Sequence, residues 1–130
     1  MDTCLIDTNI VIWMLRGASP YVQIMHQLKE HSILSISTIT ITEVYKNAFP
    51  TEMLRTEGIL DQFKSWDVTN TIAKQGGLYW QRYGKLLKTL SILDCLIAAT
   101  AEEQDLTLLT LNTRHFPMDD IKVVNPLKIS

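Results

Sequence analysis

Short apolar segments alternate with helical segments along the whole chain, and this alternation constrains the fold more than any other feature. The apolar, strand-like segments are 3–6, 33–36, 66–68, 106–111 and 121–124. Stretches with helical spacing separate them, over 9–15, 21–29, 40–48, 52–64, 71–90 and 91–104. Because strands that alternate with helices form parallel sheets covered on both faces, we predict an α/β fold with a central, mainly parallel sheet. At 130 residues, the chain is expected to form a single domain over 1–130.

Composition excludes several classes of protein. Apolar residues make up 46% and charged residues 20%, which is typical of a folded chain and not of a disordered one. No apolar run reaches the roughly 18 residues that a membrane-spanning helix needs, so no membrane association is expected. The N-terminus carries Asp2 where a signal peptide would carry lysines, so a cytoplasmic protein is expected, with Cys4 and Cys95 as thiols.

Charge is distributed unevenly along the chain. The 14 acidic residues outnumber the 12 basic ones, so global attraction to a polyanion is not the main binding force. Between Asp67 and Asp94, however, there is no acid, and this segment contains four bases, Lys74, Arg82, Lys85 and Lys88. They form either a solvated helix face or a strip that contacts phosphates.

Three acids lie in unusually apolar surroundings. Asp7 ends the first strand-like segment, and Glu43 and Asp94 each lie near the start of a predicted helix. A lone buried carboxylate is unfavourable, so each needs a partner, a capping role or a cation. Ligands of parallel sheets bind at the carboxyl ends of the strands, where these acids are expected to converge. Hard oxygen ligands favour Mg²⁺ or Mn²⁺, which would relieve the mutual repulsion of the carboxylates.

Helix capping is the alternative explanation for each acid. Ser91 and Asp94 fit the S-x-x-D capping pattern, Thr40 and Glu43 fit T-x-x-E, and Asp7 can cap the helix after it. Capping does not exclude metal binding, because an acid in a first helical turn can also face a cleft. The two explanations therefore stay open together.

Other motifs are weaker. No phosphate-binding loop of the G-x-x-x-x-G-K-[ST] type is present. The pair Asp7 and Asn9 is similar to the D-x-D opening of aspartyl-phosphate phosphatases, but the second acid is missing. Cys95 and His115 as nucleophile and base is a chance pairing, and His115 before Phe116 is expected to be a packing residue.

The order of the motifs resembles a known family. The segments are LIDTNIVI at 5–12, STITITEVY at 37–45, LDCLIAATA at 93–101 and LTLNTRHF at 109–116. Together they resemble the PIN-domain ribonucleases, and among these the VapC-like toxins of bacterial toxin–antitoxin pairs. The resemblance covers nearly the whole chain. It implies a three-layer α/β/α sandwich and cleavage of RNA that depends on Mg²⁺ or Mn²⁺.

The resemblance also assigns roles to residues. It places the catalytic residues at Asp7, Glu43, Asp94 and Asn112, of which the three acids bind the metal. It places further polar residues of the site at Thr8, Asn9 and Thr110. Many PIN domains carry a fourth acid where this chain has Asn112, which puts a second metal ion in doubt. Candidates for binding the RNA are Thr8, Asn9, Thr110 and the bases Arg16 and Arg114, with Lys46 and Lys88 as further bases.

Partners follow from the same resemblance. A small antitoxin is expected to bind a groove near the acids, and a homodimer is expected. Four aromatic residues are candidates for a docking surface or for the core: Trp13, Tyr79, Trp80 and Tyr83. Two rival functions remain, a non-catalytic PIN-like binding module that acts with a DNA-binding antitoxin and a metal-dependent phosphatase.

Overall fold

The computed structural model describes residues 2–128 and contains a five-stranded sheet. Its strands lie in the order β3-β2-β1-β4-β5, and every neighbouring pair is parallel. The bounds are β1 Asp2–Ile6, β2 Ser32–Ser37, β3 Lys64–Trp66, β4 Thr107–Leu109 and β5 Val123–Val124. The prediction of a parallel α/β sheet is confirmed.

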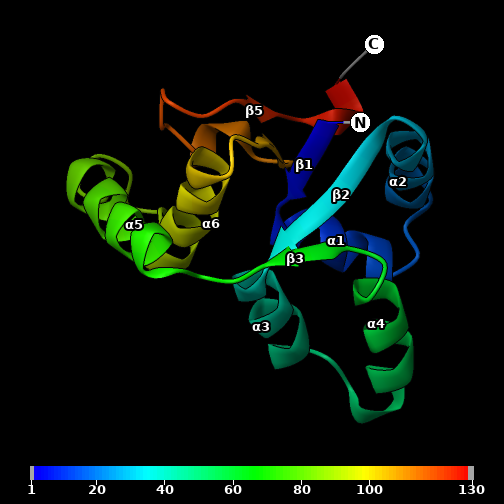
Figure 1. Ribbon diagram of the computed structural model, residues 1–130. Coiled ribbons are helices and arrows are strands. Elements are labelled where there is room, and N and C mark those ends of the chain that lie inside the picture. Colours follow the sequence, from blue (N-terminus) through cyan, green and yellow to red (C-terminus); the bar gives the residue numbers. More distant parts are fainter. Residues whose placement is uncertain (1, 129–130) are drawn as a thin grey trace.

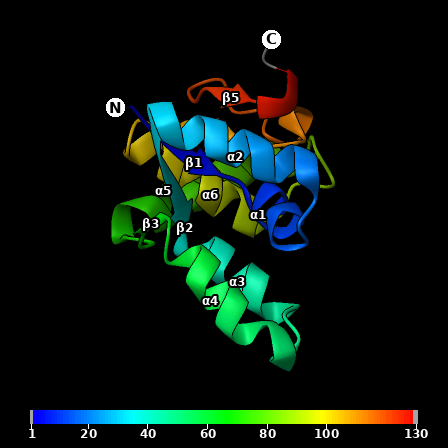
Figure 2. The ribbon, with the colours of Figure 1, turned by 90° about the vertical axis from the view of Figure 1, so that its right-hand side faces the viewer.

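Helices cover both faces of this sheet. Their bounds are α1 Thr8–Leu15, α2 Ser19–His31, α3 Thr38–Lys46, α4 Met53–Leu60, α5 Asn70–Tyr83 and α6 Ile92–Glu103. Three 3-10 turns complete the chain, η1 Pro50–Glu52, η2 Thr113–His115 and η3 Pro126–Lys128. In Figure 1, α5 and α6 lie on one side of the sheet, and α1 and α2 lie on the other. Figures 1 and 2 both show α3 and α4 extending together beyond one end of the strands. No helix within residues 2–128 is both long and apolar enough to cross a bilayer.

Two hydrophobic cores hold the layers together, one on each face of the sheet. Successive residues of β1 divide between them, because side chains alternate across a strand. Leu5 packs with α5 and α6, whereas Cys4 and Ile6 pack with α1, α2 and α3. Leu108 and Leu109 of β4 divide in the same way. Both faces of the central strands are therefore buried, which explains why their sequences are continuously apolar.

Several predicted boundaries were wrong. The helix predicted over 71–90 ends at Tyr83, because the chain turns at Gly84 and returns over 85–90 to the start of α6. The helix predicted over 52–64 is the shorter α4, since Phe63 enters the core and the next residues form β3. β3 itself is 64–66 instead of 66–68. The strand predicted over 106–111 is shortened to β4. The Thr110 N–H still donates to the Val124 carbonyl at 3.0 Å, and beyond it the chain turns into η2.

The contact between α5 and α6 depends on Gly76. A Cβ atom on Gly76 would lie 2.7 Å from Cδ2 and 3.4 Å from Cα of Leu96, whereas one on Gly77 would meet nothing within 4 Å.

We expect Gly77→Ala to stabilise the protein by about 0.5–1 kcal/mol through helix propensity. Gly76→Ala should be about 1–3 kcal/mol less stable than Gly77→Ala, because it overpacks the interface. Urea denaturation of both variants measures this difference, and equal stabilities would contradict the packing argument.

Candidate active site

The candidate site lies where the strand order reverses at the centre of the sheet. From β1 the chain builds β2 and β3 on one side, and β4 and β5 are added on the other. Ligands of open parallel sheets bind outside the carboxyl ends of the strands at such a switch point. Asp7 directly follows β1, and Thr110 directly follows β4. The backbone N–H of Asp7 also donates to the carbonyl of Leu109 at 2.9 Å, which joins the two strand ends.

Asp7 is a buried carboxylate that is held on both sides. Its Oδ1 accepts from the backbone N–H of Thr8 at 2.8 Å, and its Oδ2 accepts from the Thr110 hydroxyl at 2.8 Å. Only 6% of the residue is exposed. Burial raises the pKa of Asp7 to about 6, and the negative charges of Asp94 and Glu43 add to this shift, whereas the two hydrogen bonds oppose it. The site therefore concentrates negative charge at low solvent exposure.

Glu43 reaches the same place from α3. Its Oε1 accepts from the Thr8 hydroxyl at 2.7 Å. Because the Thr8 proton is used in this bond, the buried Thr40 hydroxyl is the donor in the 2.9 Å contact between Thr40 and Thr8. α3 is capped by Ser37, whose hydroxyl accepts from the N–H of Ile39 at 3.0 Å. The T-x-x-E capping prediction was therefore wrong, and Glu43 is free to face the site.

Asp94 lies in the first turn of α6 and belongs to a capping box. Ser91 Oγ accepts from the Asp94 N–H at 3.1 Å, and Asp94 Oδ2 accepts from the Ser91 N–H at 3.0 Å and hydroxyl at 2.8 Å. The same Oδ2 lies 2.6 Å from Nε2 of His115. The predicted S-x-x-D cap is confirmed, and the predicted capping by Asp7 of α1 is confirmed as well.

These side chains line one shared pocket, here called the acid pocket. Its lining residues are Asp7, Thr8, Asn9, Ile12, Glu43, Asp94, Asn112 and His115. The side-chain oxygen of Asn9 is buried there and has no hydrogen-bond partner within residues 2–128. A buried polar atom without a partner is unfavourable, so this oxygen is available to a ligand.

The donors of the acid pocket suit a hard cation that keeps part of its water shell. Carboxylate and amide oxygens dominate the lining, and these are the ligands of Mg²⁺ and Mn²⁺. Within residues 2–128, no three His, Cys, Asp or Glu side chains are arranged to hold an ion by themselves. Mg²⁺ is usually bound by one or two carboxylates with several waters, so a dedicated cluster of three is not required.

Comparison with known proteins assigns the family. A family model described as PIN domain matches residues 4–121. The chain belongs to the PIN-domain family. Its PIN relatives include two proteins of Mycobacterium tuberculosis, Ribonuclease VapC10 and Ribonuclease VapC19. VapC10 is 32% identical over 88% of this chain and 86% of its own length, and VapC19 is 33% identical over 88% and 92%.

Solved structures agree with the PIN assignment. A toxin–antitoxin complex from Klebsiella pneumoniae contains a chain with a TM-score of 0.78 and 31% identity, over 97% of this chain and 99% of that one. A chain of FitAB bound to a DNA fragment has a TM-score of 0.79 and 25% identity, over 98% and 97%. The predicted PIN-like α/β/α sandwich is confirmed.

The PIN fold brings some of the predicted binding residues to the acid pocket and leaves others outside it. Thr8, Asn9 and Asn112 line the pocket, and Thr110 reaches it through Asp7. Arg16 lines a different cavity, and exposed Arg114 is not among the lining residues. Arg16 lies outside the acid pocket because it follows the carboxyl end of α1, whereas Asp7 lies at the start of that helix.

Two residues that contact side chains of the acid pocket were not predicted from the sequence. His115 was expected to be a packing residue, yet it lines the acid pocket and contacts Asp94, while its neighbour Phe116 enters the core. Thr40 was interpreted as a cap, yet it bonds to Thr8. Only the spacing of helix residues, which puts 40 and 43 on one face of α3, points to Thr40 in advance. The pairing of Cys95 with His115 is excluded, because Cys95 is buried and burial raises the pKa of its thiol to about 11.

The raised pKa of Asp7 predicts a pH dependence of stability in EDTA. The folded protein holds the Asp7 proton up to about pH 6, whereas the unfolded chain releases it near 3.8. Stability from this group is therefore complete below pH 3.8 and is lost as pH rises through 6. The free energy of unfolding should fall by about 2–3 kcal/mol through this interval. Urea denaturation from pH 4 to pH 8 measures it, and Asp7→Asn should flatten the dependence. An unchanged profile in that variant would contradict the assignment.

Proposed function

We propose that this chain is a metal-dependent endoribonuclease, and that it acts as the toxin of a toxin–antitoxin pair through a single PIN-like nuclease domain, 1–130. The observation that carries the proposal is the meeting of Asp7, Glu43 and Asp94 in one pocket at the switch point of a PIN sheet. Two relatives that are more than 30% identical are named ribonucleases, which supports the same activity. The similar structure from Klebsiella pneumoniae, 31% identical, is a toxin–antitoxin complex, which supports the biological setting.

In this proposal Asp7, Glu43 and Asp94 surround Mg²⁺ or Mn²⁺ and bind it partly through its water shell, with the unpartnered Asn9 oxygen beside them. When bound, the ion lowers the pKa of a coordinated water and neutralises charge on the phosphoryl group. The chain's own residues keep the carboxylates oriented. Thr110 and the Thr8 N–H fix Asp7, and the Thr8 hydroxyl fixes Glu43.

Asn112 limits the number of negative charges in the acid pocket. It stands in the acid pocket where many PIN domains have a fourth acid, and its amide adds no negative charge. We therefore propose one tightly held ion. The exposed bases Lys88 and Arg114 belong to segments that lead into Asp94 and His115, so they are the proposed contacts for the RNA backbone. Arg16 lines a second cavity next to the acid pocket. From there it is proposed to contact the RNA or the antitoxin.

Replacing Asp94 tests the activity. Asp94→Asn should reduce RNA cleavage by at least about 100-fold and should abolish the rise in Tm that millimolar Mn²⁺ causes in the unmodified protein, because a metal ligand is lost. Asp119→Asn is the matched control, since Asp119 is an exposed acid outside the pocket.

Each rival function gives a different outcome in the same assays. Full cleavage by Asp94→Asn, or full cleavage without metal, would contradict the mechanism. Faster turnover of small phosphate esters than of RNA would indicate a phosphatase. The capping bonds of Asp7 and Asp94 favour the binding-module alternative, which predicts neither cleavage nor a Tm shift.

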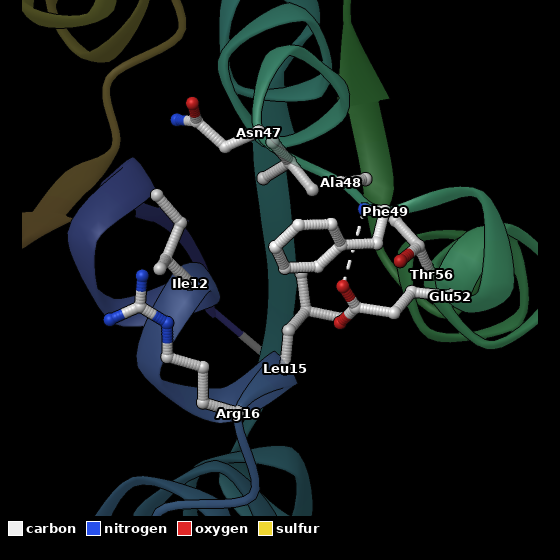
Figure 3. Close-up of a pocket in the computed structure, with 9 residues that line it drawn as sticks. Ile12, Leu15, Arg16, Asn47, Ala48, Phe49, Glu52 and Thr56 are labelled. Carbon is white, nitrogen blue, oxygen red and sulfur yellow. Dashed lines mark hydrogen bonds between the residues drawn. The ribbon is translucent and has the colours of Figure 1, made fainter.

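A second cavity, here called the apolar groove, is the proposed docking site of the antitoxin. It lies between α1, α3 and the start of α4 and is lined by Ile12, Leu15, Arg16, Val44, Asn47, Ala48, Phe49, Glu52 and Thr56. Ile12 lines both the groove and the acid pocket, so the two are adjacent. Figure 3 shows the ring of Phe49 directed toward Leu15, with the Glu52 carboxylate beside it. An antitoxin segment with apolar side chains and a basic residue fits this groove. Its apolar side chains would contact the apolar walls, and its basic residue would lie near Glu52 and the acids of the adjacent pocket.

Phe49 is expected to be the main anchor of that contact. It is a large aromatic with 69% of its surface exposed, and such residues dominate the energies of protein interfaces. Phe49→Ser should weaken binding of the antitoxin encoded by the adjacent reading frame by at least about 10-fold while the RNase activity is retained. Leu86→Ser is the control, because Leu86 is 81% exposed and lies outside the groove. Titration calorimetry measures both affinities, and equal values for the two variants would contradict this docking site.

A further inference from the structure

One oxygen of Asp94 is surrounded by donors from two distant parts of the chain. Oδ2 lies 3.0 Å from the Ser91 backbone nitrogen, 2.8 Å from the Ser91 hydroxyl and 2.6 Å from His115 Nε2. Ser91 directly precedes α6, whereas His115 ends the η2 turn that follows β4. Within residues 2–128, the hydrogen bonds of the Asp94 carboxylate all involve Oδ2. The other oxygen, Oδ1, is left to the acid pocket that Asp94 lines.

The second nitrogen of the His115 ring has a partner that is consistent with this arrangement. Nε2 must carry a proton to donate to Asp94, so Nδ1 of the neutral ring is an acceptor. The Thr89 hydroxyl lies 3.3 Å from Nδ1 and can donate a hydrogen bond to it. Thr89 and Ser91 belong to the same segment between α5 and α6, so this segment contacts both His115 and Asp94.

Packing keeps the ring in place. Phe116, the next residue, is buried in the core and meets the His115 ring edge-on, with centroids 5.7 Å apart and planes at 84°. His115 and Asp94 have side chains that are 19% and 18% exposed, so water competes little for their contact. The contact is a strong one, because its acceptor is a carboxylate.

We propose that His115 is a positioning residue that sets the affinity of the acid pocket for its divalent cation. By donating to Oδ2, it fixes the rotation of the Asp94 carboxylate so that Oδ1 alone is presented to the ion. A ligand oriented in advance loses less freedom when the ion binds, and such supporting hydrogen bonds typically change metal affinity 10–100-fold. This inference rests on the proposed function, since it assumes that Asp94 is a metal ligand.

The same contact connects α6 to the end of β4. The Ser91 capping bonds orient Asp94 only relative to its own helix, whereas His115 ties the carboxylate to the strand end that also supplies Thr110 and Asn112. His115 therefore fixes Asp94 relative to Asp7. Donation from Nε2 is the property that matters, so a side chain that places an N–H at the same point should replace it.

The test compares His115→Gln with His115→Phe. Glutamine can place its amide N–H near the position of Nε2, whereas phenylalanine keeps the ring and removes the donor. His31→Phe is the matched control, because His31 is exposed, does not line the pocket and lies before the amino end of β2, whereas the pocket lies at the carboxyl ends of the strands. Calorimetric titration of the metal-free proteins with Mn²⁺ should show affinity at least about 10-fold weaker for His115→Phe. His115→Gln and His31→Phe should bind nearly as the unmodified protein does.

Cleavage assays separate positioning from a loss of structure. At low Mn²⁺, His115→Phe should cleave RNA slowly, and saturating Mn²⁺ should restore most of its kcat with little change in KM. A variant that is merely unfolded is not rescued in this way. In the unmodified, metal-free protein, NMR of the imidazole nitrogens should show the proton on Nε2, and this measurement requires no variant to fold.

The outcomes distinguish this inference from the proposed function. If His115→Phe binds Mn²⁺ as tightly as the unmodified protein while Asp94→Asn does not bind, the positioning role is wrong and the metal site stands. Weakening by His115→Gln but not by His115→Phe would assign the effect to ring packing and would overturn the inference. Equal weakening by both variants, or an NMR signal for a proton on Nδ1 alone, would also overturn it, because the N–H at Nε2 would then not be the property that matters. Failure of the unmodified protein to bind Mn²⁺ would overturn both proposals.

Discussion

The buried carboxylate of Asp7 is the constraint on which the site depends. A carboxylate with 6% exposure needs compensation, and the protein supplies it from the ends of two neighbouring strands. The Thr8 N–H approaches from the start of α1, and the Thr110 hydroxyl approaches from the end of β4. These two bonds oppose the effect of burial on the pKa of Asp7 but do not overcome it. The negative charge that remains is the feature of the acid pocket that favours a cation.

Each further element adds a polar group to this arrangement through a bond that also stabilises the fold. Glu43 is oriented by Thr8, which is itself bonded to Thr40 of α3. Asp94 caps α6 through Ser91 and contacts His115 beyond β4. The capping and ligand explanations of these acids are therefore compatible. A carboxylate has two oxygens, and in Asp94 one serves the cap while the other is left to the pocket.

The sequence predicted the architecture well, because the architecture depends on short-range patterns. Alternation of apolar strands and helices specified a parallel sheet, and an acid directly after a strand must lie at its carboxyl end. Element ends were less predictable. α5 ends at Tyr83, where the chain turns back toward α6, and β4 ends at Leu109, shortly before the chain turns into η2. Where the chain turns depends on the packing of segments that are distant in sequence.

Sequence alone determined the identity of the acids, the position of Asp7 after a strand and of Asp94 at a helix start, and the membership of the PIN family that these motifs indicate. The tertiary structure decided how the side chains are used. Arg16 lines the apolar groove, and Glu43 accepts from Thr8 instead of capping α3. His115 contacts Asp94, which is 21 residues away in sequence. The physical reason is that hydrogen-bond partners are chosen by proximity in the folded protein, and local patterns of residues do not encode that proximity.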